Sequence, residues 1–260
     1  MVRKALMAVA LAAACGVASA QEYPVKPVRF LLGGGPDAAL RMITERLSAA
    51  WGQPMLVENK PAVSGTLMSK EVASSPADGY TLMFCSSGQF TVEPFFKVSY
   101  DMARDFAGIT QVTTMPFVLS VNPKVPAANV NDLIAMAKAK PGSLNYPSSG
   151  DGSPPHVVME MFNIESGVKI VHVPYKTVQQ ATADLLGNHV QVMMIVATAL
   201  SPLLQNNSVR PLAVSSTRRS PFLPDVPTLQ EATGLPIPGA DAWNGFCAPA
   251  GTPAPVINKL

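Results

Sequence analysis

Three short segments rich in glycine and serine hold the groups best suited to binding an anion. They are residues 33–37 (Gly-Gly-Gly-Pro-Asp), 86–88 (Ser-Ser-Gly) and 146–153 (Tyr-Pro-Ser-Ser-Gly-Asp-Gly-Ser), and each follows a predicted strand. Glycine lets the chain curl so that successive N–H groups converge on an anion, and serine hydroxyls add further donors. Any one of these segments, taken alone, is better explained by an ordinary turn or helix cap. Three of them in one chain favour a binding cleft.

The histidines are not spaced as expected for a metal centre or a hydrolase. His156, His172 and His189 are 16 and 17 residues apart, which is not a zinc-ligand spacing. The chain has no phosphate-binding P-loop and no GxSxG nucleophile elbow. Ser153 and His156 are better explained as the cap and the first-turn residue of a helix than as a catalytic pair. We therefore expect no catalytic residue, no cofactor and no bound metal.

One segment is similar to the fingerprint of a dinucleotide-binding enzyme. Gly33-x-Gly35-x-x-Ala38 lies between a predicted strand and a predicted helix, and Glu58 ends the next strand. Pro36 inside the turn, an export signal and the lack of a hydride-transfer site argue against this interpretation. An exported dinucleotide-binding oxidoreductase is therefore the alternative prediction.

The first twenty residues have the three parts of a secretory signal peptide. Arg3 and Lys4 form a positive head, residues 5–17 form an apolar run, and Ala18-Ser19-Ala20 is a small-residue cleavage site. An apolar run of about 13 residues is shorter than the ~20 needed to span a bilayer. A lipid anchor at Cys15 is the alternative. We expect cleavage after this site and a mature protein in the periplasm.

Composition excludes other classes of protein. The chain has 260 residues, of which 48% are hydrophobic and 14% charged, so it is too apolar for a disordered protein. Without Arg3 and Lys4, 17 basic residues balance 17 acidic ones. No basic field is then available to attract nucleic acid or anionic lipid.

Cys85 and Cys247 lie in apolar runs that are typical of strands. Export would place both in a compartment that permits oxidation. Their separation in the sequence does not reveal their distance in the fold, so a disulfide remains open. We interpret them as buried free thiols.

The hydrophobic pattern alternates between strands and helices. A strand at residues 28–32, a helix beginning at Ala38 and ending at Gly52, and a strand at 55–58 form a βαβ unit, which implies parallel strands. The apolar run from Val192 to Leu200 is interpreted as a buried strand. Open α/β sheets bind ligands at the carboxyl ends of their strands. The remaining predicted elements are helices near residues 66–74, 130–140, 155–165 and 178–186, and strands at 80–85, 117–121, 170–173, 190–196 and 211–215.

Many ordered motifs resemble one family, the Bug (TctC-like) extracytoplasmic solute receptors of the tripartite tricarboxylate transporter family. The resemblance covers essentially all of residues 21–260. The motifs that carry it are Tyr23-Pro24-x-Lys26-Pro27, Gly34-Gly35-x-Asp37, Val57-Glu58-Asn59-Lys60-Pro61, Pro76-Ala77-Asp78-Gly79-Tyr80, Ser148-Ser149-Gly150-x-Gly152-Ser153-x-x-His156, His172-Val173-Pro174-Tyr175-Lys176, Leu223-Pro224-Asp225-Val226-Pro227 and Ala248-Pro249-Ala250-Gly251-Thr252-Pro253.

The resemblance implies an α/β, two-lobed type II periplasmic-binding-protein fold. Residues 21–120 with 240–260 would form the first lobe and residues 121–239 the second, with crossings near Ser120 and Ala240. The protein would be a monomer that captures a small organic carboxylate and delivers it to the inner-membrane subunits of a tripartite tricarboxylate-type transporter. A sensory role with the same kind of ligand stays open. The implied ligand-binding residues are Gly34, Gly35, Asp37, Ser86, Ser87, Ser148, Ser149, Gly150, Gly152, Ser153 and His156.

The chain departs from the family pattern in several places. The first glycine loop is shorter than usual, so one wall of the pocket is expected to be reduced. Pro154 and Pro155 lack the N–H groups that a helix start would offer an anion. Ile195 and Val196 stand where polar residues are common, which makes that side apolar. Because the chain ends at Leu260, early in a predicted helix, we expect the C-terminal part of the first lobe to be truncated.

Overall fold

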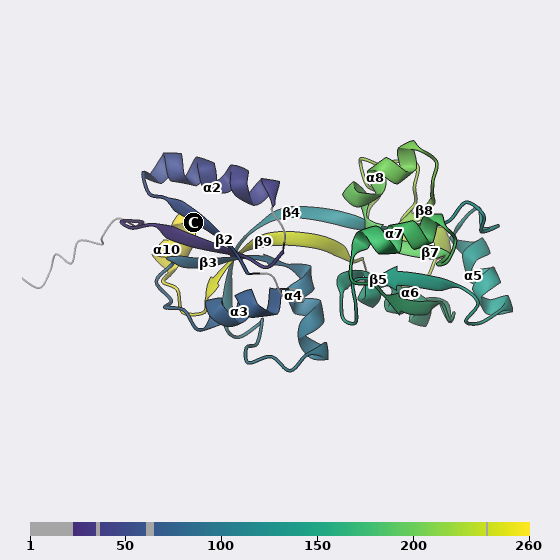
Figure 1. Ribbon diagram of the computed structural model, residues 1–260, viewed down its shortest axis with the longest axis horizontal. Helices are drawn as coiled ribbons and strands as arrows, with labels where there is room; N and C mark the ends of the chain where they lie inside the picture. Colours follow the sequence, from purple (N-terminus) through teal and green to yellow (C-terminus); the bar gives the residue numbers. More distant parts are fainter. Residues whose placement is uncertain (1–22, 35–36, 61–64, 238) are drawn as a thin grey trace, which may run out of the picture.

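Two α/β lobes are joined by two long neighbouring strands (Figure 1). The computed structural model describes residues 23–34, 37–60, 65–237 and 239–260. The predicted leader, residues 1–20, lies outside these ranges. The predicted two-lobed α/β class is confirmed, and strands from both ends of the chain share one sheet.

The first lobe is built on the predicted βαβ unit. β1 (Val28–Leu32) lies between β2 (Met55–Asn59) and β3 (Thr81–Ser86), and both pairings are parallel. All of β1 except Arg29 is buried, as expected for a central parallel strand. The carboxyl ends of these strands therefore lie at one edge of the sheet, where the first two glycine- and serine-rich segments begin.

Helices of the first lobe begin and end at recognisable signals. The α2 helix (Ala38–Trp51) begins where the Asp37 carboxylate accepts the Leu40 N–H at 2.8 Å, and it ends at Gly52 with φ of 66°. Buried Leu40 anchors it to the sheet. The lobe is completed by α3 (Thr66–Ala73), α4 (Ser87–Val92), the 3-10 turn η2 (Glu93–Phe95) and α10 (Ala254–Lys259).

Two strands cross between the lobes. In β4 (Phe106–Val121), residues 106–116 pair antiparallel with β9 (Asp241–Pro249), and residues 117–121 pair with strands of the second lobe. Figure 1 shows β4 and β9 side by side in the span between the two lobes. The sequence predicted only residues 117–121 as a strand, because the preceding stretch contains glycine, threonines and proline, and it is only half-buried. Two register shifts within it explain the irregular pattern.

The second lobe packs helices around two small groups of strands. β7 (Val192–Val196) and β8 (Arg210–Val214) pair antiparallel with β4, whereas β5 (Asn145–Ser148) and β6 (Val171–Pro174) pair parallel with each other. The prediction of a strand from Val192 to Leu200 is wrong in its second half, because α8 begins at Ala197. The helices are α5 (Val130–Ala139), α6 (Pro154–Ser166), α7 (Val178–Leu186), α8 (Ala197–Gln205) and α9 (Leu229–Thr233).

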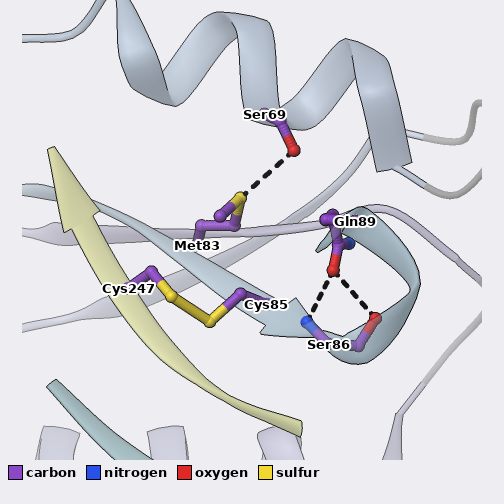
Figure 2. The surroundings of a disulfide bond; sticks show 6 residues. All are labelled: Ser69, Met83, Cys85, Ser86, Gln89 and Cys247. Carbon is purple, nitrogen blue, oxygen red and sulfur yellow. Dashed lines mark hydrogen bonds between the residues drawn. A yellow bond between two sulfur atoms is a disulfide. The ribbon is translucent and has the colours of Figure 1, made fainter. Parts of the chain in front are cut away.

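Cys85 and Cys247 form a disulfide, so the prediction of buried free thiols is wrong (Figure 2). The antiparallel pairing of β3 with β9 aligns Cys85 with Gly245 and Met83 with Cys247, which leaves the two cysteines diagonally adjacent with Cα atoms 6.0 Å apart. That separation suits a disulfide. Sequence spacing could not show this register, because the chain passes through the whole second lobe between the two strands.

Candidate functional site

A cavity of about 450 Å³ lies where the two lobes face each other. It brings together residues from the ends of β1 and β3, from β9, which crosses between the lobes, and from the second lobe. Four residues of the predicted set contribute: Gly34, Asp37, Ser86 and Ser149. The other lining residues are Leu32, Gly33, Gly65, Phe84, Gln89 and Asn244.

The first glycine segment closes one wall of this cavity. A Cβ added to Gly33 would lie 2.6 Å from the Cα of Gly65, so only glycine permits this close approach of two backbones. Asp37 uses one carboxylate oxygen to cap α2, and the positive end of the helix compensates part of its charge. Gly35 lies outside the described residues.

Ser86 is held in place by Gln89, which the sequence analysis did not single out. Oε1 of Gln89 accepts the Ser86 N–H at 2.6 Å and the Ser86 hydroxyl at 2.8 Å (Figure 2). This bonding leaves the Gln89 amide nitrogen as a donor at the cavity. The spacing of a serine followed three residues later by glutamine is a capping-box signal that could have identified Gln89. Ser87, the first residue of α4, is not among the residues that line the cavity.

The serines of the segment at residues 146–153 differ in their exposure to solvent. Ser149 is exposed and lines the cavity, whereas Ser148 and Ser153 are buried and donate to the Gly150 carbonyl at 3.0 and 2.7 Å. Ser153 is the residue before α6, as predicted, and Pro154 begins the helix. The buried hydroxyls thus shape the loop, and Ser149 is the hydroxyl that it presents to the cavity.

Gly152 and His156 lie against the first lobe rather than in the cavity lining. The Phe95 ring meets the His156 ring edge-on at 5.9 Å, and a Cβ added to Gly152 would lie 2.6 Å from Phe95. Gly152 also has φ of 72°, a conformation that favours glycine. These residues therefore form a direct contact between the lobes at the edge of the cavity.

His172 of β6 lies beside this loop. Its Nε2 is 2.6 Å from Ser148 Oγ, and its Nδ1 is 3.4 Å from Asp151 Oδ1. Burial, followed by the neighbouring His156, lowers the pKa of His172, although Asp151 acts in the opposite direction. Ser148, His172 and Asp151 thus have the order of a hydrolase triad. However, Ser148 Oγ is buried and bonded to both backbone groups of Gly150, so it is poorly placed to attack a substrate.

Asn244 is a second lining residue that the sequence analysis missed. It lies on β9, and its amide nitrogen donates to Thr113 Oγ1 of β4 at 3.1 Å. This bond links β9 to β4 beside the cavity and leaves the Asn244 carbonyl oxygen as an acceptor. The sequence held one indication of this role, because Asn244 is a polar residue directly before the apolar end of a strand.

Apolar Ile195 lines a smaller cavity of about 50 Å³ with Ser148, Ser149 and neighbouring residues of α7. The predicted apolar character of this side of the second lobe fits that placement. The space is too small to hold a solute, so the larger cavity is the better candidate for binding.

The geometry does not support the dinucleotide alternative. Both oxygens of Glu58 accept hydrogen bonds from Arg29, at 2.6 and 2.8 Å, and Lys60 lies 3.8 Å away. A ribose-binding carboxylate needs its oxygens available to the sugar. Glu58 instead belongs to an ion-pair network, with Glu71 of α3 as its second acid.

Comparisons with known proteins give one consistent result. The family model described as "Tripartite tricarboxylate transporter family receptor" matches residues 39–260. Protein BugT of Bordetella pertussis is 32% identical, over 97% of this chain and 79% of its own length. Within the described ranges, no helix is both long and apolar enough to cross a membrane.

Solved structures agree with the family model. R. palustris Rpa4515 with adipate has a TM-score of 0.77 and 34% identity, covering 92% of this chain and 81% of its own. MatC from Rhodopseudomonas palustris with bound malate has a TM-score of 0.75 and 30% identity. The match covers 91% of the present chain and 82% of the MatC chain. The predicted resemblance is confirmed: the chain belongs to the Bug (TctC-like) family of tripartite tricarboxylate transporter receptors.

Proposed function

We propose that the protein captures a small organic carboxylate in the cavity between its lobes. The observation that carries this proposal is that Gly34, Ser86 and Gln89 from the first lobe and Ser149 from the second line one cavity of about 450 Å³. A solute that touches both lobes stabilises the arrangement in which they approach each other.

The lining can bind a carboxylate through neutral donors, and Asp37, the one acid among its described residues, uses a carboxylate oxygen to cap α2. Among the described residues that line the cavity there is neither lysine nor arginine, so N–H and O–H groups must bind the negative charge. The Gln89 amide and the Ser149 hydroxyl are such donors. Relatives of known structure that hold adipate and malate support this class of ligand.

Closure is the proposed mechanism. The cavity is bordered by Asn244 on β9, and β4 and β9 are the two strands that cross between the lobes. Bending of this pair would bring Ser149 towards Ser86, remove water from the solute and strengthen each hydrogen bond to it. The ligand must therefore bind the closed form more tightly than the open form.

The proposed setting follows from the leader and from the family. Cleavage after Ala20 would release the protein into the periplasm, where it would act as a monomer and pass its solute to inner-membrane transporter subunits. The lobe boundaries proposed from the sequence, near Ser120 and Ala240, place most of the hinge strand β4 with the first lobe. No catalytic step is needed for this role.

A thermal-shift panel tests the proposal. The chain would be heated with mono-, di- and tricarboxylates and, separately, with NAD. At least one carboxylate should raise the melting temperature, and NAD should not. A shift with NAD alone would instead support the oxidoreductase.

The Ser149→Ala variant locates the binding site. We expect affinity for the selected carboxylate to fall about tenfold, because one hydrogen bond to a charged group contributes about 1.5 kcal/mol or more. Ser143→Ala is the matched control, since Ser143 is an exposed serine just before β5 whereas Ser149 follows it. Unchanged affinity in Ser149→Ala would remove this loop from the site.

A further inference from the structure

We propose that Asp151, His156 and His172 form a binding site for one divalent transition-metal ion of the zinc type. One ring nitrogen from each histidine and one carboxylate oxygen all lie within 4.8 Å of one another. The inference does not depend on the proposed carboxylate binding, because none of these three residues lines the cavity between the lobes.

The fold positions the two histidines firmly. His172 lies on β6, opposite Tyr146 of β5, and the Tyr146 ring stacks on it at 5.2 Å. His156 is in the first turn of α6, and its ring centroid lies 4.2 Å from that of His172. Sequence spacing could not indicate this pair, because strand pairing rather than a local motif brings the two rings together.

The distance between His172 and Asp151 matches that of two ligands on one ion. Nδ1 of His172 and Oδ1 of Asp151 are 3.4 Å apart. Zinc–nitrogen and zinc–oxygen bonds of about 2.0–2.1 Å at a tetrahedral angle place two ligand atoms about 3.3 Å apart. The third ligand atom, a ring nitrogen of His156, lies within 4.8 Å of the other two and must move closer to them to share the ion.

The hydrogen bonds of His172 favour a cation at Nδ1. Because the Ser148 hydroxyl donates to the Gly150 carbonyl, we assign Nε2 of His172 as the donor to Ser148 Oγ, 2.6 Å away. Metal-binding histidines commonly donate their other ring N–H to such a partner. Nδ1 then directs a lone pair at the Asp151 carboxylate, and two electron-rich atoms in this position are stabilised by a cation between them.

The donor set and its access to solvent suit a transition metal. Two imidazoles and one carboxylate are typical ligands of zinc and its neighbours, whereas calcium and magnesium prefer oxygen ligands. The side chain of Asp151 is 71% exposed, so an ion can reach it from solvent. Three protein ligands leave the fourth position of a tetrahedral ion to water.

Binding at His156 has a specific structural consequence. Its Nδ1 accepts the Gly152 N–H at 3.1 Å. An ion on Nδ1 replaces this bond, and an ion on Nε2 requires a proton on Nδ1, which also breaks it. The Gly152 amide must therefore change its environment when the ion binds, whichever nitrogen is used.

Calorimetry with zinc chloride on the tag-free chain tests the proposal. We expect one ion per chain, and at least tenfold weaker binding in Asp151→Asn and in His156→Gln. His189→Gln is the matched control, because His189 is the third histidine of the chain, is exposed and lies outside the cluster. This variant should bind zinc like the parent. Melting without metal checks that each variant folds.

Amide NMR supplies an independent readout. Zinc should shift the Gly152 amide signal in the parent and in His189→Gln, and Asp151→Asn should need at least tenfold more zinc for the same shift. No zinc binding in the parent, an equal loss in His189→Gln, or equally tight binding of calcium would each overturn the proposal.

Discussion

Removing the disulfide should destabilise the first lobe by an amount set by how the two lobes unfold. The perturbation is the double variant Cys85→Ala with Cys247→Ala, which deletes the cross-link and leaves no polar thiol in the core. The two cysteines are 162 residues apart. If both lobes unfold together, a loop of that length contributes about 5 kcal/mol through lost chain entropy.

The effective loop is shorter if the second lobe stays folded. Pro116 then remains paired with Asp241, so the flexible chain comprises about 31 residues from Cys85 to Pro116 and about six from Asp241 to Cys247. A loop of about 37 residues corresponds to about 4 kcal/mol. The size of the effect therefore reports whether the lobes unfold together or in turn.

Urea unfolding measures this difference. Trp51 and Trp243 report on the first lobe and the hinge, and circular dichroism reports on both lobes. Reductant should lower the stability of the parent and leave the double variant unchanged. The reasoning is refuted if labelling finds Cys85 and Cys247 as free thiols in the native parent, or if the double variant unfolds within about 0.5 kcal/mol of a fully oxidised parent.

Two further predictions concern residues outside the disulfide. Glu58→Gln should lower the free energy of unfolding by about 1 kcal/mol at neutral pH, because Glu58 is one-third exposed and bonded to Arg29. Arg29 holds the Glu58 pKa below its usual value, so this stabilisation is present above the unfolded pKa of about 4.3 and is lost as pH falls through the folded pKa. Urea midpoints of both proteins from pH 3 to 7 should therefore converge at the acid end, and a constant gap would contradict the assignment. Gly152→Ala should cost more stability than Gly167→Ala, because φ is similar at the two positions, 72° and 62°, but only Gly152 faces a neighbouring ring, that of Phe95. Phe95→Ala should reduce the extra loss in a double-variant cycle, and additive effects would show that the contact is not made.

Much of the fold could be predicted from the sequence, since its local signals agree with the final structure. The βαβ unit is an example, because Asp37 and Gly52 mark the two ends of α2 and the flanking strands are apolar. The long strand β4 could not be predicted in full. Its first eleven residues are stabilised by pairing with β9, more than a hundred residues away, and their own composition is typical of a loop.

The candidate site was also predicted only in part, because local signals mark some of its residues and long-range contacts position the others. Glycine and serine at strand ends indicated Gly34, Ser86 and Ser149, which the fold brings to one cavity. The sequence did not separate serines that face the cavity from serines that bond within their own loop, such as Ser153. It also gave no sign that His156 and His172 meet, because that contact depends on the pairing of β5 with β6 and the position of α6.

The cross-link between Cys85 and Cys247 limits where the molecule can bend. It fixes the inner end of β9 to β3, so this strand cannot slide along the first lobe when the lobes approach each other. Because the pairing with β3 extends to Asn244, rotation must then be taken up in residues 241–243 of β9 and their partners 114–116 on β4. Asn244 borders this short stretch and also lines the cavity, so a bound solute would contact the residue next to the segment whose backbone angles must change.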